Sequence, residues 1–83
     1  MKIRVRYFAS VREAVGQGSE ELQTQAATLA ALRDELIARG GAYAEALARG
    51  RAVRMALDQT MAQEDTALRE GSEVAFFPPV TGG

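Results

Sequence analysis

The residues with the clearest chemical potential are the last two, Gly82 and Gly83, which follow a double proline in the segment FFPPVTGG. Pro78 and Pro79 have a fixed φ and no N–H to donate, so they end a strand and favour an extended chain. Glycine lacks a Cβ and fits a narrow channel, and its terminal carboxylate is sterically open. A carboxylate becomes reactive once it is activated, for example as an acyl-adenylate. The segment therefore predicts a carrier tail that one enzyme charges and another discharges.

The length of this tail suits delivery into another protein. We expect a domain over residues 1–77 and an extended tail over residues 78–83, with Val80 and Thr81 between the prolines and the glycines. Six extended residues span up to about 20 Å. A domain this small has one thin core and cannot wrap a deep cleft around a reaction. We therefore expect the chemistry to take place in the pocket of a partner.

Composition excludes several classes of protein. The 83 residues are 47% hydrophobic and 25% charged, as in an ordinary globular domain. A net charge of −1 argues against binding to nucleic acid. The sequence has no cysteine and no histidine, so we expect no metal site and no permanently bound cofactor. No apolar run reaches the roughly 20 residues of a membrane span, and no signal peptide precedes the first strand. We expect a cytoplasmic protein without membrane contact.

The first half of the chain predicts a strand, a short helix, a weak strand and a main helix. MKIRVRYF alternates, with Ile3, Val5 and Tyr7 on one face of a half-buried strand over residues 1–8. Ser10 and Glu13 form the pattern of a capping box for a short helix that Gly16 ends. A weak strand follows over residues 19–25. The main helix begins after Thr28 and ends at the glycines of residues 40–41, with the leucines inside and the charged side chains, Arg33 included, facing away.

The second half predicts one more short helix and two strands. Residues 42–50 form the short helix, and residues 51–59 return to strand alternation with a turn at Asp58 and Gln59. We expect a loop over residues 60–71. The last strand covers residues 72–77, with Val74 and Phe76 on its inner face. This order predicts an α+β fold of the ubiquitin-like β-grasp type, a mixed sheet packed on one main helix, with a flexible Gly-Gly tail at the C-terminus.

The segment from Glu73 to Gly83, EVAFFPPVTGG, resembles the C-terminal signature of the small subunit of molybdopterin synthase, the MoaD family. The opening VRYFASVREAVG is similar to the first strand and short helix of that family, and TLAALRDELIARG stands where its main helix belongs. The resemblance covers essentially the whole chain. Its terminal segment is specific, whereas the middle matches by pattern more than by residue.

The resemblance implies a sulfur carrier rather than a complete enzyme. An adenylating enzyme of the MoeB type would activate the carboxylate of Gly83 with ATP, and a sulfurtransferase would convert the adenylate into a thiocarboxylate. The tail, with Val80, Thr81 and Gly82, would then insert into the large synthase subunit of the MoaE type. There the sulfur would pass to cyclic pyranopterin monophosphate to form molybdopterin, for the molybdenum cofactor. By resemblance, the working complex contains two small and two large subunits.

Strand alternation predicts an exposed apolar surface, and the resemblance implies that the large subunit docks there. If the first and last strands are neighbours, as in a β-grasp, then Phe8 and Phe77 share an exposed face. The resemblance adds Met61 to this partner-binding surface, together with Pro78 and Pro79. An exposed apolar cluster usually marks an interface. Arg4 and Arg6 could meet an acidic rim on the partner.

Three other readings stay open at this point. One is a carrier of the ThiS type for thiazole synthesis, which shares the fold and the Gly-Gly end. The longer chain, the extra helical stretch and FFPP favour the molybdopterin carrier instead. Another is a ubiquitin-like modifier that forms isopeptide bonds to lysines of other proteins. The last is an interaction module whose tail is idle.

Overall fold

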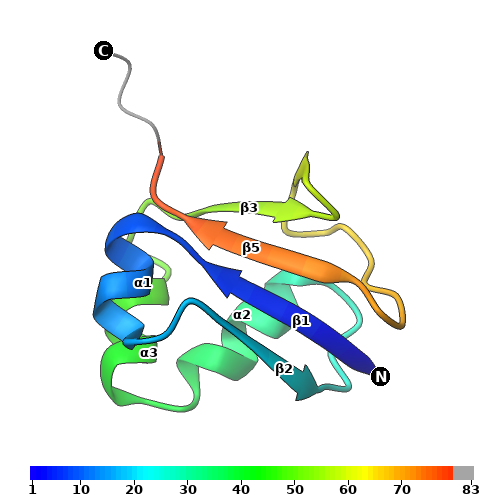
Figure 1. Cartoon of the computed structure of the whole chain (residues 1–83), viewed down its shortest axis with the longest axis horizontal. Coiled ribbons are helices and arrows are strands. Elements are labelled where there is room, and N and C mark those ends of the chain that lie inside the picture. Colours follow the sequence, from blue (N-terminus) through cyan, green and yellow to red (C-terminus); the bar gives the residue numbers. More distant parts are fainter. Residues whose placement is uncertain (80–83) are drawn as a thin grey trace.

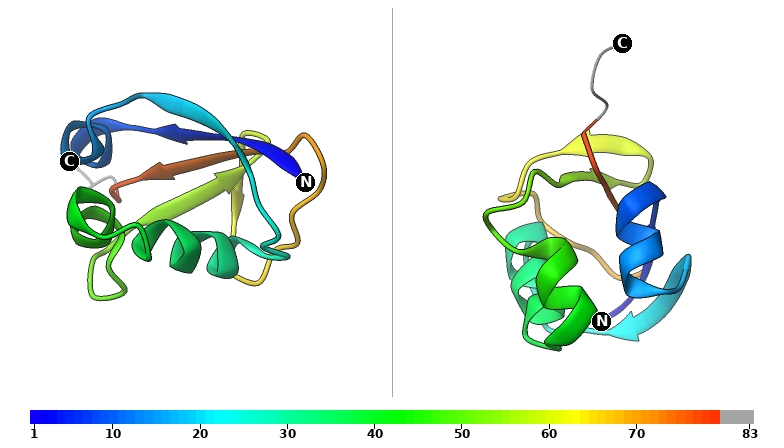
Figure 2. Two further views of the ribbon diagram at one scale, coloured as in Figure 1. Left: turned by 90° about the horizontal axis from the view of Figure 1, so that it is seen from below. Right: turned by 90° about the vertical axis from the view of Figure 1, so that its left-hand side faces the viewer.

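Five strands form one mixed sheet in the order β2-β1-β5-β3-β4 in the computed structural model, which describes residues 1–79 (Figure 1). The strands are β1 (Lys2–Tyr7), β2 (Ser19–Gln23), β3 (Arg54–Leu57), β4 (Thr60–Ala62) and β5 (Glu73–Phe77). The helices are α1 (Ala9–Val15), α2 (Leu29–Ile37) and α3 (Gly41–Leu47). Helices α2 and α3 lie along one face of the sheet, and α1 lies at the end where β1 finishes (Figure 2). The predicted β-grasp arrangement is confirmed.

The two central strands, β1 and β5, run parallel although they come from opposite ends of the chain. Val5 pairs with Val74 and Tyr7 with Phe76, and all four side chains are buried on the helix side. β2 and β3 flank this pair in antiparallel register. The predicted faces of the first and last strands are therefore confirmed. A slip of one residue would have turned every apolar side chain of these strands outward.

Helix α2 supplies most of the apolar surface that covers the sheet. The Thr28 hydroxyl accepts a hydrogen bond from the backbone N–H of Ala31 at 3.2 Å, which confirms the predicted N-cap. Leu29, Leu32 and Leu36 are each fully buried. These leucines recur at helical spacing and pack against the inner faces of the central strands as one core cluster.

Several predicted boundaries are wrong at the ends of elements. The capping box is wrong because α1 begins at Ala9 with Phe8 at its N-cap, so Ser10 lies inside the first turn. The strand pairing reaches Phe8, whose N–H donates to the Phe76 oxygen at 3.1 Å, and the helix follows at once. α2 ends at Ile37, and Gly41 opens α3 instead of ending α2.

The predicted loop over residues 60–71 contains a strand, β4, at the edge of the sheet. Asp58 and Gln59 both have positive φ, at 49° and 70°, which is the geometry of a tight hairpin turn. The predicted turn at Asp58 and Gln59 is therefore confirmed. β4 is only three residues long, and one of them, Met61, points outward, so no alternation was visible in the sequence.

Arg33 was predicted to face away from the core, and this prediction is wrong because its side chain is buried. Its Nε donates to the Leu47 oxygen at 2.8 Å and one Nη donates to the Ala48 oxygen at 2.8 Å. These carbonyls end α3 and have no partner within that helix. The guanidinium therefore ties the end of α3 to the middle of α2.

We expect Arg33→Met to lower the free energy of unfolding by about 2–4 kcal/mol, because it keeps the apolar stem but leaves the two carbonyls without a charged donor. Urea unfolding followed by circular dichroism measures this loss. Arg69→Met, at an exposed position, is the matched control and is expected to change stability by less than about 0.5 kcal/mol. Equal effects of the two substitutions would contradict the role of Arg33.

A second polar tie is centred on Glu20 in the edge strand β2. One oxygen of its carboxylate accepts hydrogen bonds from the Tyr7 hydroxyl at 2.8 Å, from Arg39 at 3.0 Å, and from the Tyr43 hydroxyl at 3.2 Å. Burial alone would raise the pKa of the Glu20 carboxyl, but these hydrogen bonds outweigh it and hold the pKa below its ordinary value. Glu20 thus joins β2 and β1 to α3 and to the end of α2.

Because its pKa is lower in the folded than in the unfolded protein, Glu20 stabilises the fold above its unfolded pKa of about 4.3. That contribution is lost as the pH falls through the lower folded pKa. We expect Glu20→Gln to lower the free energy of unfolding by about 1–3 kcal/mol at pH 7. The variant should also lose less stability than the wild type when the pH falls below about 4. Urea midpoints at pH 7 and in the acid range measure both effects. Glu13→Gln, at an exposed position of α1, is the control, and an equal acid response of the two variants would refute this assignment.

Candidate functional site: the outer face of the sheet

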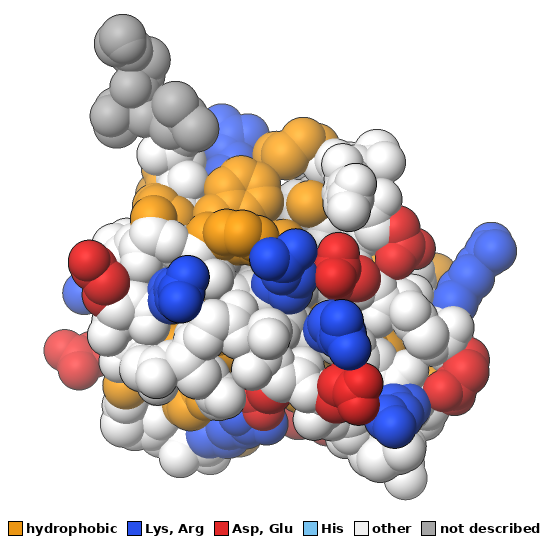
Figure 3. All heavy atoms as spheres, viewed as in Figure 1, with side chains coloured by type: hydrophobic (Ala, Val, Ile, Leu, Met, Phe, Trp, Pro, Cys, Tyr) orange, Lys and Arg blue, Asp and Glu red, His pale blue; other side chains and the backbone are white. Residues whose placement is uncertain are grey.

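The outer face of the sheet, opposite the helices, carries an apolar cluster at the end where β5 finishes. Tyr7 pairs with Phe76, so the following residues, Phe8 and Phe77, occupy neighbouring positions on the outer face. In the next row, Ala56 pairs with Ala75 on one side and with Met61 on the other. We call Phe8, Ala56, Met61, Ala75 and Phe77 the outer apolar patch. Figure 3 shows hydrophobic side chains gathered on this face below the grey residues.

Two members of the patch are unusually exposed for large apolar side chains. Met61 exposes 57% of its surface and Phe8 exposes 38%, and they are the only exposed large hydrophobic residues in the described part of the chain. Ala56 is buried and forms part of the floor between them. Exposed apolar groups that cluster in this way, instead of being scattered singly, are typical of an interface.

Arginines border the patch. The guanidinium of Arg6 lies 5.1 Å from the centre of the Phe8 ring, within the range of a cation–π contact. Arg54 is the cross-strand partner of Phe77 and is exposed. Arg4, further along β1, instead pairs with Glu21 at 3.3 Å. The patch is therefore apolar at its centre and positive at its border, and an acidic rim on a partner would complement it.

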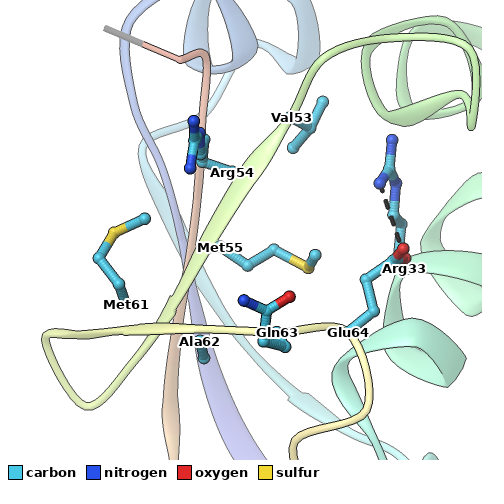
Figure 4. Close-up of a pocket in the computed structure, with 8 residues that line it drawn as sticks. All are labelled: Arg33, Val53, Arg54, Met55, Met61, Ala62, Gln63 and Glu64. Carbon is cyan, nitrogen blue, oxygen red and sulfur yellow. Dashed lines mark ion pairs between the residues drawn. The ribbon is translucent and has the colours of Figure 1, made fainter.

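A hollow of about 500 Å³ opens beside the patch. β4 pairs with β3 only as far as Met55, and the chain then turns toward α2, where the Glu64 oxygen accepts a hydrogen bond from the N–H of Ala30 at 2.8 Å. This divergence leaves the start of β3 without a neighbour on that side (Figure 4). The residues that line the hollow are Arg33, Val53, Arg54, Met55, Met61, Ala62, Gln63 and Glu64. The lining is mixed, with Arg33, Arg54 and Glu64 next to the apolar side chains of β3 and β4.

The structure brings the predicted docking residues to one edge of the molecule. Phe8, Phe77 and Met61 all lie on the outer face, and Pro78 and Pro79 follow β5 directly. Phe77 is half-buried, so it is less exposed than expected. Ala9 has a φ of 50° and turns the chain sharply into α1, which fixes Phe8 at the rim of the patch. The predicted tail residues Val80, Thr81, Gly82 and Gly83 lie outside the described residues.

Sequence reasoning missed the two alanines of the patch and the role of Arg54 at its border. Ala56 and Ala75 lie opposite each other in the β3–β5 register. Because both side chains are small, the surface is recessed at the centre of the patch. Strand alternation does place Ala75 on the face of Phe77, but it did not assign either alanine to the docking surface. Ala56 could not be paired with Met61, because β4 was not recognised as a strand.

Two other features are absent from residues 1–79. No helix in this range is long and apolar enough to cross a membrane. Within the same residues, no group of three or more acidic side chains is placed to hold a metal ion.

Comparison with known proteins gives a consistent result along the whole chain. A model of the ThiS family matches residues 5–83. The molybdopterin synthase sulfur carrier subunit of Escherichia coli is 44% identical over 81 residues, which cover 98% of this chain and 99% of that protein. The subunit of the same name from Haemophilus influenzae is 40% identical over 81 residues, with the same coverage.

Solved structures agree with the fold. The putative molybdopterin converting factor subunit 1 of Pyrococcus furiosus superposes with a TM-score of 0.79 at 26% identity, covering 96% of this chain and 99% of that chain. A chain in the complex of subunits 1 and 2 of the molybdopterin-converting factor of Helicobacter pylori gives a TM-score of 0.69 at 25% identity, with full coverage of both. From residue 5 to its end, the sequence matches one family model, and this chain belongs to the ThiS family.

Proposed function

We propose that this protein is the sulfur carrier subunit of a molybdopterin synthase. One observation carries the proposal: 98% of the chain aligns, at 44% identity, with a curated protein of that name. The geometry supports it, because the outer apolar patch lies at the end of the sheet from which the C-terminal segment continues. A carrier needs a surface for its partners next to the group that it delivers.

The proposed chemistry takes place at the carboxyl group of Gly83. Its oxygen attacks the α-phosphate of ATP on an adenylating enzyme of the MoeB type, releases pyrophosphate and forms an acyl-adenylate. Sulfide-level sulfur supplied through a sulfurtransferase then attacks the carbonyl carbon, the bond from that carbon to the AMP oxygen breaks, and a thiocarboxylate remains. ATP is thus consumed by the partner and is not a resident cofactor. We place these steps in the cytoplasm, where ATP is available.

The large synthase subunit, of the MoaE type, is the proposed acceptor of the charged tail. The complex of subunits 1 and 2 of the converting factor from H. pylori supports a partner of this kind. The outer apolar patch would dock on that subunit, with the border arginines against acidic groups. Val80, Thr81 and Gly82 would then carry the thiocarboxylate into the active site, where cyclic pyranopterin monophosphate receives the sulfur.

The curated relatives favour this function over the related carrier of thiazole synthesis. Three relatives at 38–44% identity cover 98–100% of this chain, and all three are named as molybdopterin synthase sulfur carrier subunits. A ubiquitin-like modifier would use the same fold and tail. It differs in its acceptor, which is an amine of another protein and not a sulfur acceptor in the synthase.

Gly83 deletion and Gly82→Val are each expected to abolish molybdopterin formation in a reconstituted synthase. The first removes the group that carries sulfur, and the second adds a β-branched side chain where a narrow channel must be passed. Both are expected to leave the melting temperature unchanged, because β5 ends at Phe77. Gly50→Ala is the control, since a Cβ there meets no atom within 4 Å. Full activity of either tail variant would contradict the proposed mechanism.

Phe8→Ala and Met61→Ala are each expected to weaken binding to the large subunit by about tenfold, which corresponds to about 1.4 kcal/mol. Both side chains are exposed, so their loss should cost little folding stability. Titration calorimetry with the large subunit measures the affinity. Gln23→Ala, at an exposed position on the far edge strand, is the control. Unchanged affinity in both patch variants would show that the partner docks elsewhere.

A further inference from the structure

The chain carries its positive charge almost entirely on arginine. Of its ten basic residues, Lys2 is the single lysine, and the sequence contains no cysteine and no histidine. Lysine amines, thiolates and imidazoles are the side chains that accept acyl groups most readily. The guanidinium of arginine stays protonated in proteins and is a poor nucleophile. A surface rich in arginine and poor in lysine therefore offers few acyl acceptors to a carboxyl group that becomes activated in the same protein.

The two amines of the chain lie at the end of the sheet opposite the outer apolar patch. Lys2 is the first residue of β1, and its Nζ lies 3.5 Å from the Glu21 carboxylate. The amino group of Met1 donates to the Thr24 oxygen at 2.8 Å. β1 and β5 are parallel, so β5 finishes beside the far end of β1 (Figure 1). The C-terminal segment thus starts about 20 Å from Lys2, at roughly 3.3 Å per strand residue.

This distance matters because an acyl-adenylate reacts with amines. In that reaction, which rests on the proposed function, the amine nitrogen bonds to the carbonyl carbon of Gly83, the bond from that carbon to the AMP oxygen breaks, and AMP leaves. The amine gives its proton to water. The product is an amide, and the carrier can no longer accept sulfur.

Other nucleophiles near the end of β5 are poorly placed for this reaction. Tyr7 is 1% exposed, and its hydroxyl donates to Glu20. Burial, together with the hydrogen bond and negative charge of Glu20, raises the pKa of Tyr7 above its ordinary value, so it is not a phenolate. The cations on the outer face next to β5, Arg6 and Arg54, are both guanidinium groups.

We propose that the arginine surface around the end of β5 leaves the activated carboxyl group of Gly83 without an acceptor in its own chain, and that Lys2 is the one side chain at which a second copy can be acylated. Residues 78–83 have a full contour of about 20 Å, no more than the distance from their start to Lys2. Even with the reach of the Lys2 side chain included, closure would need residues 78–83 near their full contour, for which the effective concentration is very low. Lys2 is exposed, and its ion pair with Glu21 is a weak surface pair, so a second molecule can reach it.

The test uses the full chain prepared as a small-molecule thioester at Gly83, incubated at mildly alkaline pH. An amine attack releases the thiol and gives a closed amide, whose mass is one water lower than that of the hydrolysed acid. We compare the wild type with Arg54→Lys, which puts an amine beside Phe77, and with Arg69→Lys, which puts one in the loop whose Gly71 N–H donates to the Lys2 oxygen at 2.8 Å. Both variants keep the charge, and both positions are exposed.

We expect Arg54→Lys to form at least about tenfold more closed amide than the wild type or Arg69→Lys. A lysine beside Phe77 lies well within the contour of residues 78–83, and short linkers of this kind give millimolar effective concentrations. At high protein concentration, covalent dimers of the wild type should map to Lys2 and fall sharply in Lys2→Arg. A closed amide in the wild type, none in Arg54→Lys, or dimers linked through another side chain would overturn the inference. The thioester is prepared without an adenylating enzyme. If enzymatic charging fails, that failure counts against the proposed function, and the amide assay still tests this inference.

Discussion

The parallel pairing of β1 with β5 is the constraint on which the rest of the structure depends. It joins the two ends of the sequence at the centre of the sheet, with Val5 against Val74 and Tyr7 against Phe76. The same register fixes the outer face, where Phe8 comes to lie beside Phe77. Because both strands run in one direction, the outer apolar patch and the start of the C-terminal segment share one end of the sheet. The lysine at the start of β1 lies at the other end.

Two buried polar ties hold the helices on the inner face and so leave the outer face free. Arg33 fastens the end of α3 to α2, and Glu20 fastens the edge strand β2 to both helices through Tyr43 and Arg39. Each tie satisfies groups that would otherwise be buried without a partner, at a cost of one to a few kcal/mol. These contacts hold the helices in one arrangement against the small core.

Much of this fold could be predicted from periodicity, because strand alternation in MKIRVRYF and SEVAFF and the leucine spacing of α2 report which side chains are buried. The burial of Arg33 could not be predicted, since its acceptors are carbonyls of another helix and leave no pattern in the sequence around it. β4 was missed although the turn before it was predicted, because a strand of three residues is too short to show alternation. For the site, alternation placed Phe8 and Phe77, but the hollow beside Met61 depends on where β4 leaves β3, which only the tertiary structure decides.

The measurement that tests the central claim most directly is the intact mass of the full chain after incubation with its adenylating partner, ATP and a sulfur source. The account predicts a gain equal to the replacement of one oxygen by one sulfur, mapped by fragmentation to Gly83. An unchanged mass, when the same partner preparation charges another carrier, would contradict it. The outer apolar patch would then be a docking surface without this sulfur chemistry.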